Sequence, residues 1–191
     1  MNWIEKLIVC LAALLLLTSS TFDAALADNG DKERRRYRKR HRNSAEHNSK
    51  SQLTPVNNST YKESCGTCHF TYQPELLPSA SWGKILDRFD DHFGEQIDLD
   101  QESKEIITDY LRANSAEHSS AKRAVKIMRS LRGQTPMRIT DVPYIREKHQ
   151  DDDIPADAFT RKSVGSMSNC IACHTTAKNG IYEDDHVVIP R

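Results

Sequence analysis

The sequence predicts a mainly α-helical fold, on two observations. Apolar residues recur at intervals of three and four in several segments, which is the period of an amphipathic helix. The chain has no strand-rich stretch, and it holds neither a P-loop nor a dinucleotide-binding fingerprint. We therefore expect helices over 82–93, over about 100–114 and within 115–132.

The helix expected over 82–93 has one apolar face. Its side chains fall at positions i, i+3, i+4 and i+7, with Phe93 four residues further on. Ser79 or Ser81 can cap its start, and Gly94 stands where a helix commonly ends. The stripe consists of Trp82, Ile85, Leu86 and Phe89.

The two following helices are expected from similar stripes. Asp98 and Asp100 lie near the start of 100–114, where acidic side chains favour the helix dipole. Two prolines break the pattern after 115–132, and from Lys162 onward the chain shows little regular period. The stripes are Ile106, Ile107, Tyr110 and Leu111 in the first helix, and Ala121, Val125, Met128 and Leu131 in the second.

Residues 1–27 are predicted to be a secretory signal peptide. Lys6 precedes an apolar run at 7–17, and 25–27 form a small-x-small cleavage pattern. An uncleaved membrane anchor is the alternative, but a span needs about 20 apolar residues. Export without a nuclear or mitochondrial signal predicts the periplasm.

Residues 28–59 are predicted to be a disordered basic linker. They contain nine Lys/Arg and four Asp/Glu, a balance of +5, whereas 60–191 contain 17 and 21, a balance of −4. A solvated spacer is one interpretation of the most basic run, 32–42. The other is an electrostatic contact with anionic lipid or an acidic protein. Nucleic acid is not an expected partner of an exported chain.

Two short motifs carry the chemistry, and they account for all four cysteines after residue 27. Their Cys-x-x-Cys-His spacing is typical of c-type haem attachment, which takes place outside the bacterial cytoplasm. Two thiols three residues apart can each bond one vinyl group of a porphyrin, and the adjacent His supplies the proximal nitrogen to iron. The motifs are Cys65-Gly66-Thr67-Cys68-His69 and Cys170-Ile171-Ala172-Cys173-His174.

Other functions of these cysteines fit less well. A zinc ribbon needs Cys pairs roughly 15–20 residues apart, whereas residues 69–169 separate these. A thioredoxin-like motif belongs in a βαβ context, which the pattern lacks. Two structural disulfides are the remaining alternative in an exported protein. The sequence therefore predicts two covalently bound haem c groups.

Each iron then needs a sixth ligand. His92 lies 23 residues after His69, and His149 lies 25 residues before His174, which gives one candidate per haem. From spacing alone, the alternatives stay open: His118 and His186, the tail residues His41 and His47, and the thioethers of Met128, Met137 and Met167.

Residues 61–191 resemble the dihaem cytochrome c family. The longest matching run is 65–78, and the match continues through Ser81-Trp82 to His92-Phe93-Gly94-Glu95. Further matches are Ile107-Thr108-Asp109-Tyr110-Leu111, Arg138-Ile139-Thr140, His149, Asn169-Cys170-Ile171-Ala172-Cys173-His174 and Ile189-Pro190-Arg191.

This resemblance implies two lobes, an N-terminal class I cytochrome-like helical domain and an irregular C-terminal haem domain. We place the first haem domain at 60–114 and the second at 115–191. The resemblance also implies bis-His ligation, which pairs His69 with His92 and His174 with His149.

The function expected is one-electron transfer, because an iron with two fixed His ligands has no open site for a substrate. The resemblance implies a carrier between a membrane-bound quinol-oxidising cytochrome and a soluble, oxygen-binding high-spin cytochrome. The alternative is a haem enzyme, such as a dihaem peroxidase or reductase with one displaceable sixth ligand. A haem-containing sensor or interaction module ranks last, because the sequence shows no output domain.

Overall fold

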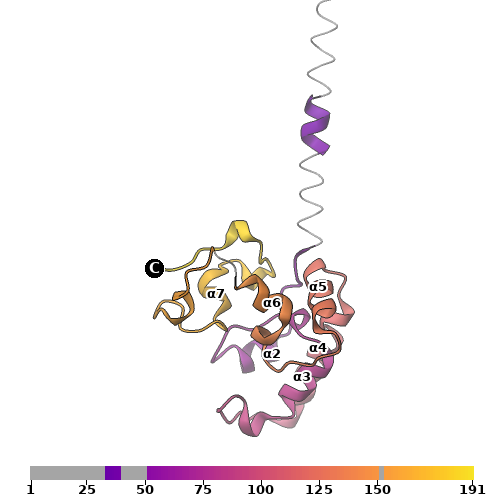
Figure 1. Ribbon diagram of the computed structural model, residues 1–191. Helices are drawn as coiled ribbons and strands as arrows, with labels where there is room; N and C mark the ends of the chain where they lie inside the picture. The colour runs from indigo at the N-terminus through magenta and orange to yellow at the C-terminus, as the bar shows by residue number, and fades with distance from the viewer. Residues whose placement is uncertain (1–32, 40–50, 151–152) are drawn as a thin grey trace, which may run out of the picture. The chain divides into compact units, whose positions relative to one another are not determined.

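The computed structural model describes residues 33–39, 51–150 and 153–191 (Figure 1). By its contacts the chain divides into two units, 1–48 and 49–191. The predicted signal peptide, 1–27, lies outside the described residues. No helix in the described ranges has the length and apolar content needed to cross a bilayer.

The predicted disordered linker, 28–59, differs from the structure in two stretches. Residues 33–39 form an exposed helix. The sequence showed no apolar period there, but Arg, Lys and Glu are good helix formers without one. Residues 51–59 belong to the second unit, in which Leu53 and Val56 are buried in the core. The folded body thus begins before residue 60.

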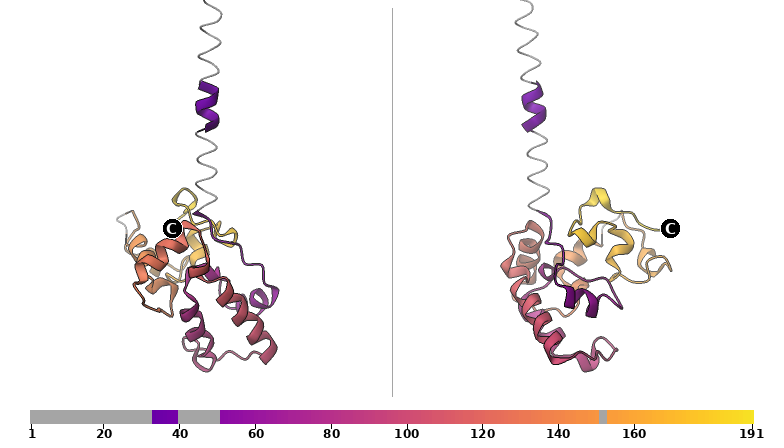
Figure 2. Two further views of the ribbon diagram at one scale, coloured as in Figure 1. Left: turned by 90° about the vertical axis from the view of Figure 1, so that its right-hand side faces the viewer. Right: turned by 180° about the vertical axis from the view of Figure 1, so that it is seen from behind.

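The second unit is mainly helical, as predicted (Figures 1 and 2). Its described residues contain no strand, only two isolated bridges, His92 with Glu95 and His174 with Val187. Short 3₁₀ turns connect the helices. The α-helices are α2 (Ser59–Cys65), α3 (Ser79–Leu86), α4 (Gln101–Ala113), α5 (Lys122–Leu131), α6 (Pro143–Lys148) and α7 (Cys170–Cys173).

Helix α3 is shorter than predicted and starts earlier. Asp87 caps its end, and a 3₁₀ turn at Phe89–Asp91 follows. The predicted serine cap is not used: the carboxylate of Glu117 accepts the Ser79 N–H at 2.9 and 3.1 Å. The prediction of one helix over 82–93 is therefore wrong at its end. The apolar period of the sequence continues to Phe93, but the α-helix stops at Leu86 and a 3₁₀ turn follows.

Helix α4 agrees closely with its predicted range, although Ile106 of the predicted stripe is exposed. Asp100 is its N-cap and accepts the backbone N–H of Ser103 at 2.8 Å. Ile107 and Leu111 are buried, and α4 packs against α3 and α2. Helix α5 lies within the predicted 115–132, but its buried residues are Ala124, Ile127 and Leu131, so only Leu131 of the predicted stripe is buried.

The two ends of the second unit meet in its core. The Leu53 N–H donates to the Gly180 carbonyl at 2.9 Å, and the buried carboxylate of Glu75 accepts from Thr54. The Ala116 N–H donates to the Leu77 carbonyl at 3.0 Å. Since contacts gather 49–191 into one unit, the division at residue 114 stays a prediction.

Candidate haem-binding site

The first Cys-x-x-Cys-His motif begins where α2 ends. The Gly66 N–H donates to the Lys62 carbonyl at 3.0 Å. A Cβ atom on residue 66 would lie 2.3 Å from that carbonyl oxygen, so glycine permits the turn that follows. The turn leaves Cys65 half-buried and Cys68 exposed, both as free thiols.

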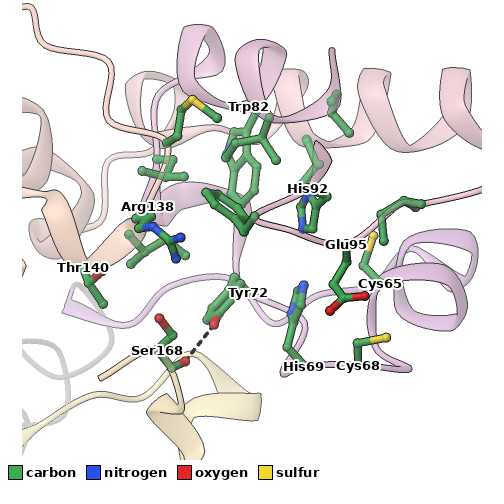
Figure 3. Close-up of a pocket in the computed structure, with 18 of the residues that line it drawn as sticks. Cys65, Cys68, His69, Tyr72, Trp82, His92, Glu95, Arg138, Thr140 and Ser168 are labelled. Atoms are coloured by element: carbon green, nitrogen blue, oxygen red, sulfur yellow. Dashed lines mark hydrogen bonds between the residues drawn. The ribbon is translucent and has the colours of Figure 1, made fainter. Parts of the chain in front are cut away.

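The rings of His69 and His92 point toward one another (Figure 3). Their centroids are 6.4 Å apart and their planes make an angle of 18°. The Nδ1 of His69 donates to the Phe70 carbonyl at 2.7 Å, which leaves the lone pair on Nε2. With an imidazole–metal bond of about 2 Å, two rings on opposite sides of one metal have centroids roughly 6 Å apart. The pair fits one iron.

A tight turn holds the backbone of His92. Its N–H donates to the Glu95 carbonyl at 2.7 Å, and Phe93 and Gly94 adopt positive φ angles of 58° and 102°. Burial lowers the pKa of His92, and the neighbouring charges of His69 and Arg138 lower it further. Its Nδ1 is buried without a hydrogen-bond partner among the described residues. A neutral, unpartnered imidazole suits a metal ligand.

The second motif forms α7, and it also lies beside its predicted partner. The centroids of the His149 and His174 rings are 5.9 Å apart, and their planes cross at 68°. His149 caps the end of α6, and its Nδ1 donates to the Ile145 carbonyl at 2.7 Å. Cys170 and Cys173 are free thiols. The structure thus brings together both predicted His pairs.

Burial dominates the acid–base properties of the second motif. It lowers the pKa of His174 to about 4, with further lowering from His149 and Arg123 and an opposing effect of Asp184. It also raises the pKa of Cys170 to about 11, as it does that of Cys65 in the first motif. At neutral pH both cysteines are therefore protonated thiols.

A largely apolar cavity of about 560 Å³ adjoins the first motif. Trp82 lines this cavity. Its indole Nε1 donates to the Pro74 carbonyl at 2.8 Å, so the indole N–H already has a hydrogen-bond partner outside the cavity. Cys65, His69 and His92 line the same space. Thiols, imidazoles and an apolar wall are the groups that covalently held haem needs, so the residues fit it.

The other candidate ligands differ in how near they lie to these pairs. Among the ring contacts of the described residues, neither His118 nor His186 contacts a motif histidine. Met137 and Met167 line the cavity, whereas Met128 packs against the core. His41 and His47 lie outside the described residues. Within the described ranges, no three His, Cys, Asp or Glu side chains gather as a metal cluster.

Buried and partly buried hydrogen bonds join the segments of the two motifs, and the sequence did not predict them. The Tyr72 hydroxyl, three residues after His69, donates to the Ser168 carbonyl at 2.7 Å. The Gln73 side chain donates to the Ala177 carbonyl at 2.6 Å and accepts from the Tyr182 hydroxyl at 2.5 Å. In the sequence, the only indication was that Tyr72 and Gln73 are polar and lie close to the first haem motif, and this did not identify their hydrogen-bond partners.

Comparisons with known proteins agree with this site. The family model for dihaem cytochrome c matches residues 61–182. A diheme cytochrome c from Rhodobacter sphaeroides is 36% identical, with 68% of this chain and 100% of that chain covered and a TM-score of 0.59.

Two further solved structures are similar. A structure of DHC purified from Rhodobacter sphaeroides is 32% identical over 67% of this chain and 99% of that chain, with a TM-score of 0.53. The diheme cytochrome type c from Shewanella baltica OS155 is 31% identical over 70% and 93%, with a TM-score of 0.56. A comparison with curated proteins found no match. The chain therefore belongs to the dihaem cytochrome c family, a family of electron-transfer cytochromes with two covalently bound haem c groups.

Proposed function

We propose that this chain carries single electrons, with His69 and His92 as axial ligands of one haem and His174 and His149 of the other. The strongest support is the spacing of the two ring pairs, 6.4 and 5.9 Å between centroids. Two ring nitrogens facing one iron leave no open coordination position for a substrate. That geometry favours a carrier over a peroxidase or reductase.

The remaining motif residues hold the cofactor. Cys65 and Cys68 would form the thioether bonds in the first motif, and Cys170 and Cys173 would form them in the second. When bound, each haem supplies a one-electron iron couple whose potential depends on its ligands, burial and hydrogen bonds. The Nδ1–H bonds of His69 and His149 to backbone carbonyls keep each ring in one tautomer and orientation.

The partners we propose are a membrane-bound quinol-oxidising cytochrome as donor and a soluble haem protein as acceptor, in the periplasm. Residues 32–42 would add an electrostatic contact with anionic lipid or an acidic protein. Cytochromes c are typically exported, and the sequence of 1–27 has the features of a signal peptide. Deletion of 32–42 should weaken binding to vesicles of anionic lipid or to the membrane donor. Unchanged binding at low salt would exclude this contact.

Carbon monoxide tests the central proposal. The reduced holoprotein, with two haems by pyridine haemochrome assay, should show low-spin spectra that carbon monoxide leaves unchanged. Binding of carbon monoxide at either haem, accompanied by peroxide turnover, would replace the carrier with an enzyme. A sulfur–iron charge-transfer band would replace one distal His by a Met.

A further inference from the structure

Arg123 on α5 holds its positive charge in a mostly buried position. Its side chain is only 18% exposed, and its Nη2 donates to the Tyr182 carbonyl at 3.0 Å. The guanidinium carbon lies 5.5 Å from the centre of the Tyr182 ring. Its Nε is buried and has no hydrogen-bond partner among the described residues. Such an arrangement costs desolvation energy that a surface arginine avoids.

Arg123 is close to the second His pair. The Tyr182 ring that it covers lies 5.3 Å from the His174 ring, and the charge of Arg123 acts directly on His174. Two carboxylates oppose it. Glu183 lies 3.6 Å from Nη2 and is 31% exposed, and Asp184 also acts on His174. Because a buried charge is screened less than an exposed one, the charge of Arg123 acts more strongly at a distance than that of the more exposed Glu183.

We propose that Arg123 is a positioning residue for electron transfer that raises the reduction potential of the haem bound by His174 and His149. The inference rests on the proposed ligation by these two histidines. A fixed positive charge favours the reduced iron, since reduction removes one positive charge from the centre. The carbonyl of Tyr182 and the stacked ring hold the guanidinium in place, and salt screens its charge less than that of an exposed arginine.

Among the described residues, the first His pair has no matching buried cation. Arg138 acts on His92, but its side chain is exposed and stacks on Phe93 with 4.2 Å between the guanidinium carbon and the ring centre. Solvent and salt screen it. Arg123 therefore makes the reduction potentials of the two haems unequal although their proposed ligands are of the same type. The second haem would be reduced before the first.

The test is a redox titration of the holoprotein followed by EPR, in which the differing ring angles of the two His pairs separate their signals. Arg123→Gln should lower the reduction equilibrium constant of the second haem about tenfold, or about 59 mV for one electron. The first haem should change much less. Arg123→Lys keeps the charge and should retain most of the wild-type potential.

Arg129→Gln is the matched control, because Arg129 is an exposed arginine on the same helix. It should leave both potentials in place. Equal shifts of both haems in Arg123→Gln, an unchanged second haem, or Arg123→Lys behaving as Arg123→Gln would overturn the proposal. A role in packing alone would lower thermal stability without a selective change in potential.

Glu183→Gln gives a second measurement if Arg123→Gln does not mature. Removal of that carboxylate leaves the charge of Arg123 less compensated, so the second haem should become easier to reduce, and an unchanged or lowered potential contradicts the proposal. The wild-type spectrum keeps the two hypotheses distinguishable. If it lacks two bis-His signals, the proposed ligation fails, whereas two such signals with no selective effect of Arg123 reject only this inference.

Discussion

The His69 and His92 rings lie nearly parallel, with 18° between their planes. Their orientation follows from local backbone structure on both sides. His69 is held by its own Nδ1 bond to the Phe70 carbonyl, and His92 is held by a turn closed through Glu95. In the second pair, His149 and His174 cross at 68°. With the proposed ligation, the two haems should therefore differ in electronic structure although each would have two His ligands.

This difference in angle predicts two distinct EPR signals. Parallel imidazoles split the iron d orbitals that overlap with their π systems, and crossed imidazoles leave those orbitals nearly degenerate. We expect a rhombic low-spin signal from the His69–His92 haem and a strongly anisotropic one, with a large highest g value, from the His149–His174 haem. EPR of the oxidised protein at helium temperature checks this. Two identical rhombic signals would contradict the angles.

Removal of either distal His should free the sixth coordination position of one haem iron and leave that of the other occupied. His92→Ala should make the first haem bind carbon monoxide, and His149→Ala should do the same for the second, because each loses one of two axial nitrogens. Each variant serves as the control for the other. Absorption spectra should show half of the haem shifted in either variant. A variant that stays fully six-coordinate would identify its substituted His as a non-ligand.

The chemistry of the site was predictable from sequence because the haem motifs are local. Two thiols and one imidazole within five residues imply their cofactor without knowledge of the fold. To predict His92 and His149 as their partners, we also needed a count of the remaining donor residues and a family resemblance. What the spacing did not predict was the ring angle, since it depends on the turn at Phe93 and on the end of α6.

The fold was predictable where a helix has its own cap and stripe, as in α4 with Asp100 and Ile107. It was not predictable where distant contacts decide. Glu117, 38 residues away, caps α3, and no local pattern reveals such a partner. The 51–59 stretch was predicted to be linker because Leu53 and Val56 are its only aliphatic residues. In the structure both are buried, and the Leu53 N–H donates to the carbonyl of Gly180, which is 127 residues away in the sequence.

Tyr72→Phe should weaken the link between the two motifs. It removes the hydroxyl that donates to the Ser168 carbonyl in a partly buried position, where burial raises the pKa of Tyr72 to about 12. We expect a loss of about 1 to 2 kcal/mol in unfolding free energy. Tyr110→Phe is the control, because its hydroxyl accepts a 3.3 Å bond from Asn57 in an exposed setting. Denaturant unfolding of both holoproteins measures the difference, and equal losses would argue against a buried link.

Gly180→Ala should be among the most damaging single-methyl changes in the chain. Gly180 has a φ of +73°, and an added Cβ would lie 1.9 Å from the Leu53 carbonyl oxygen, in backbone that cannot move aside as a side chain does. The left-handed conformation alone costs about 1 kcal/mol or more for alanine, and the clash adds the loss of the Leu53–Gly180 hydrogen bond. Gly133→Ala is the matched control, since its φ is +85° but a Cβ there meets nothing within 4 Å. We expect Gly180→Ala to lower the midpoint of thermal unfolding well below that of Gly133→Ala, and 51–59 to become accessible to protease. Equal midpoints would mean that 51–59 does not pack on the body as described, and the folded unit would then begin nearer residue 60.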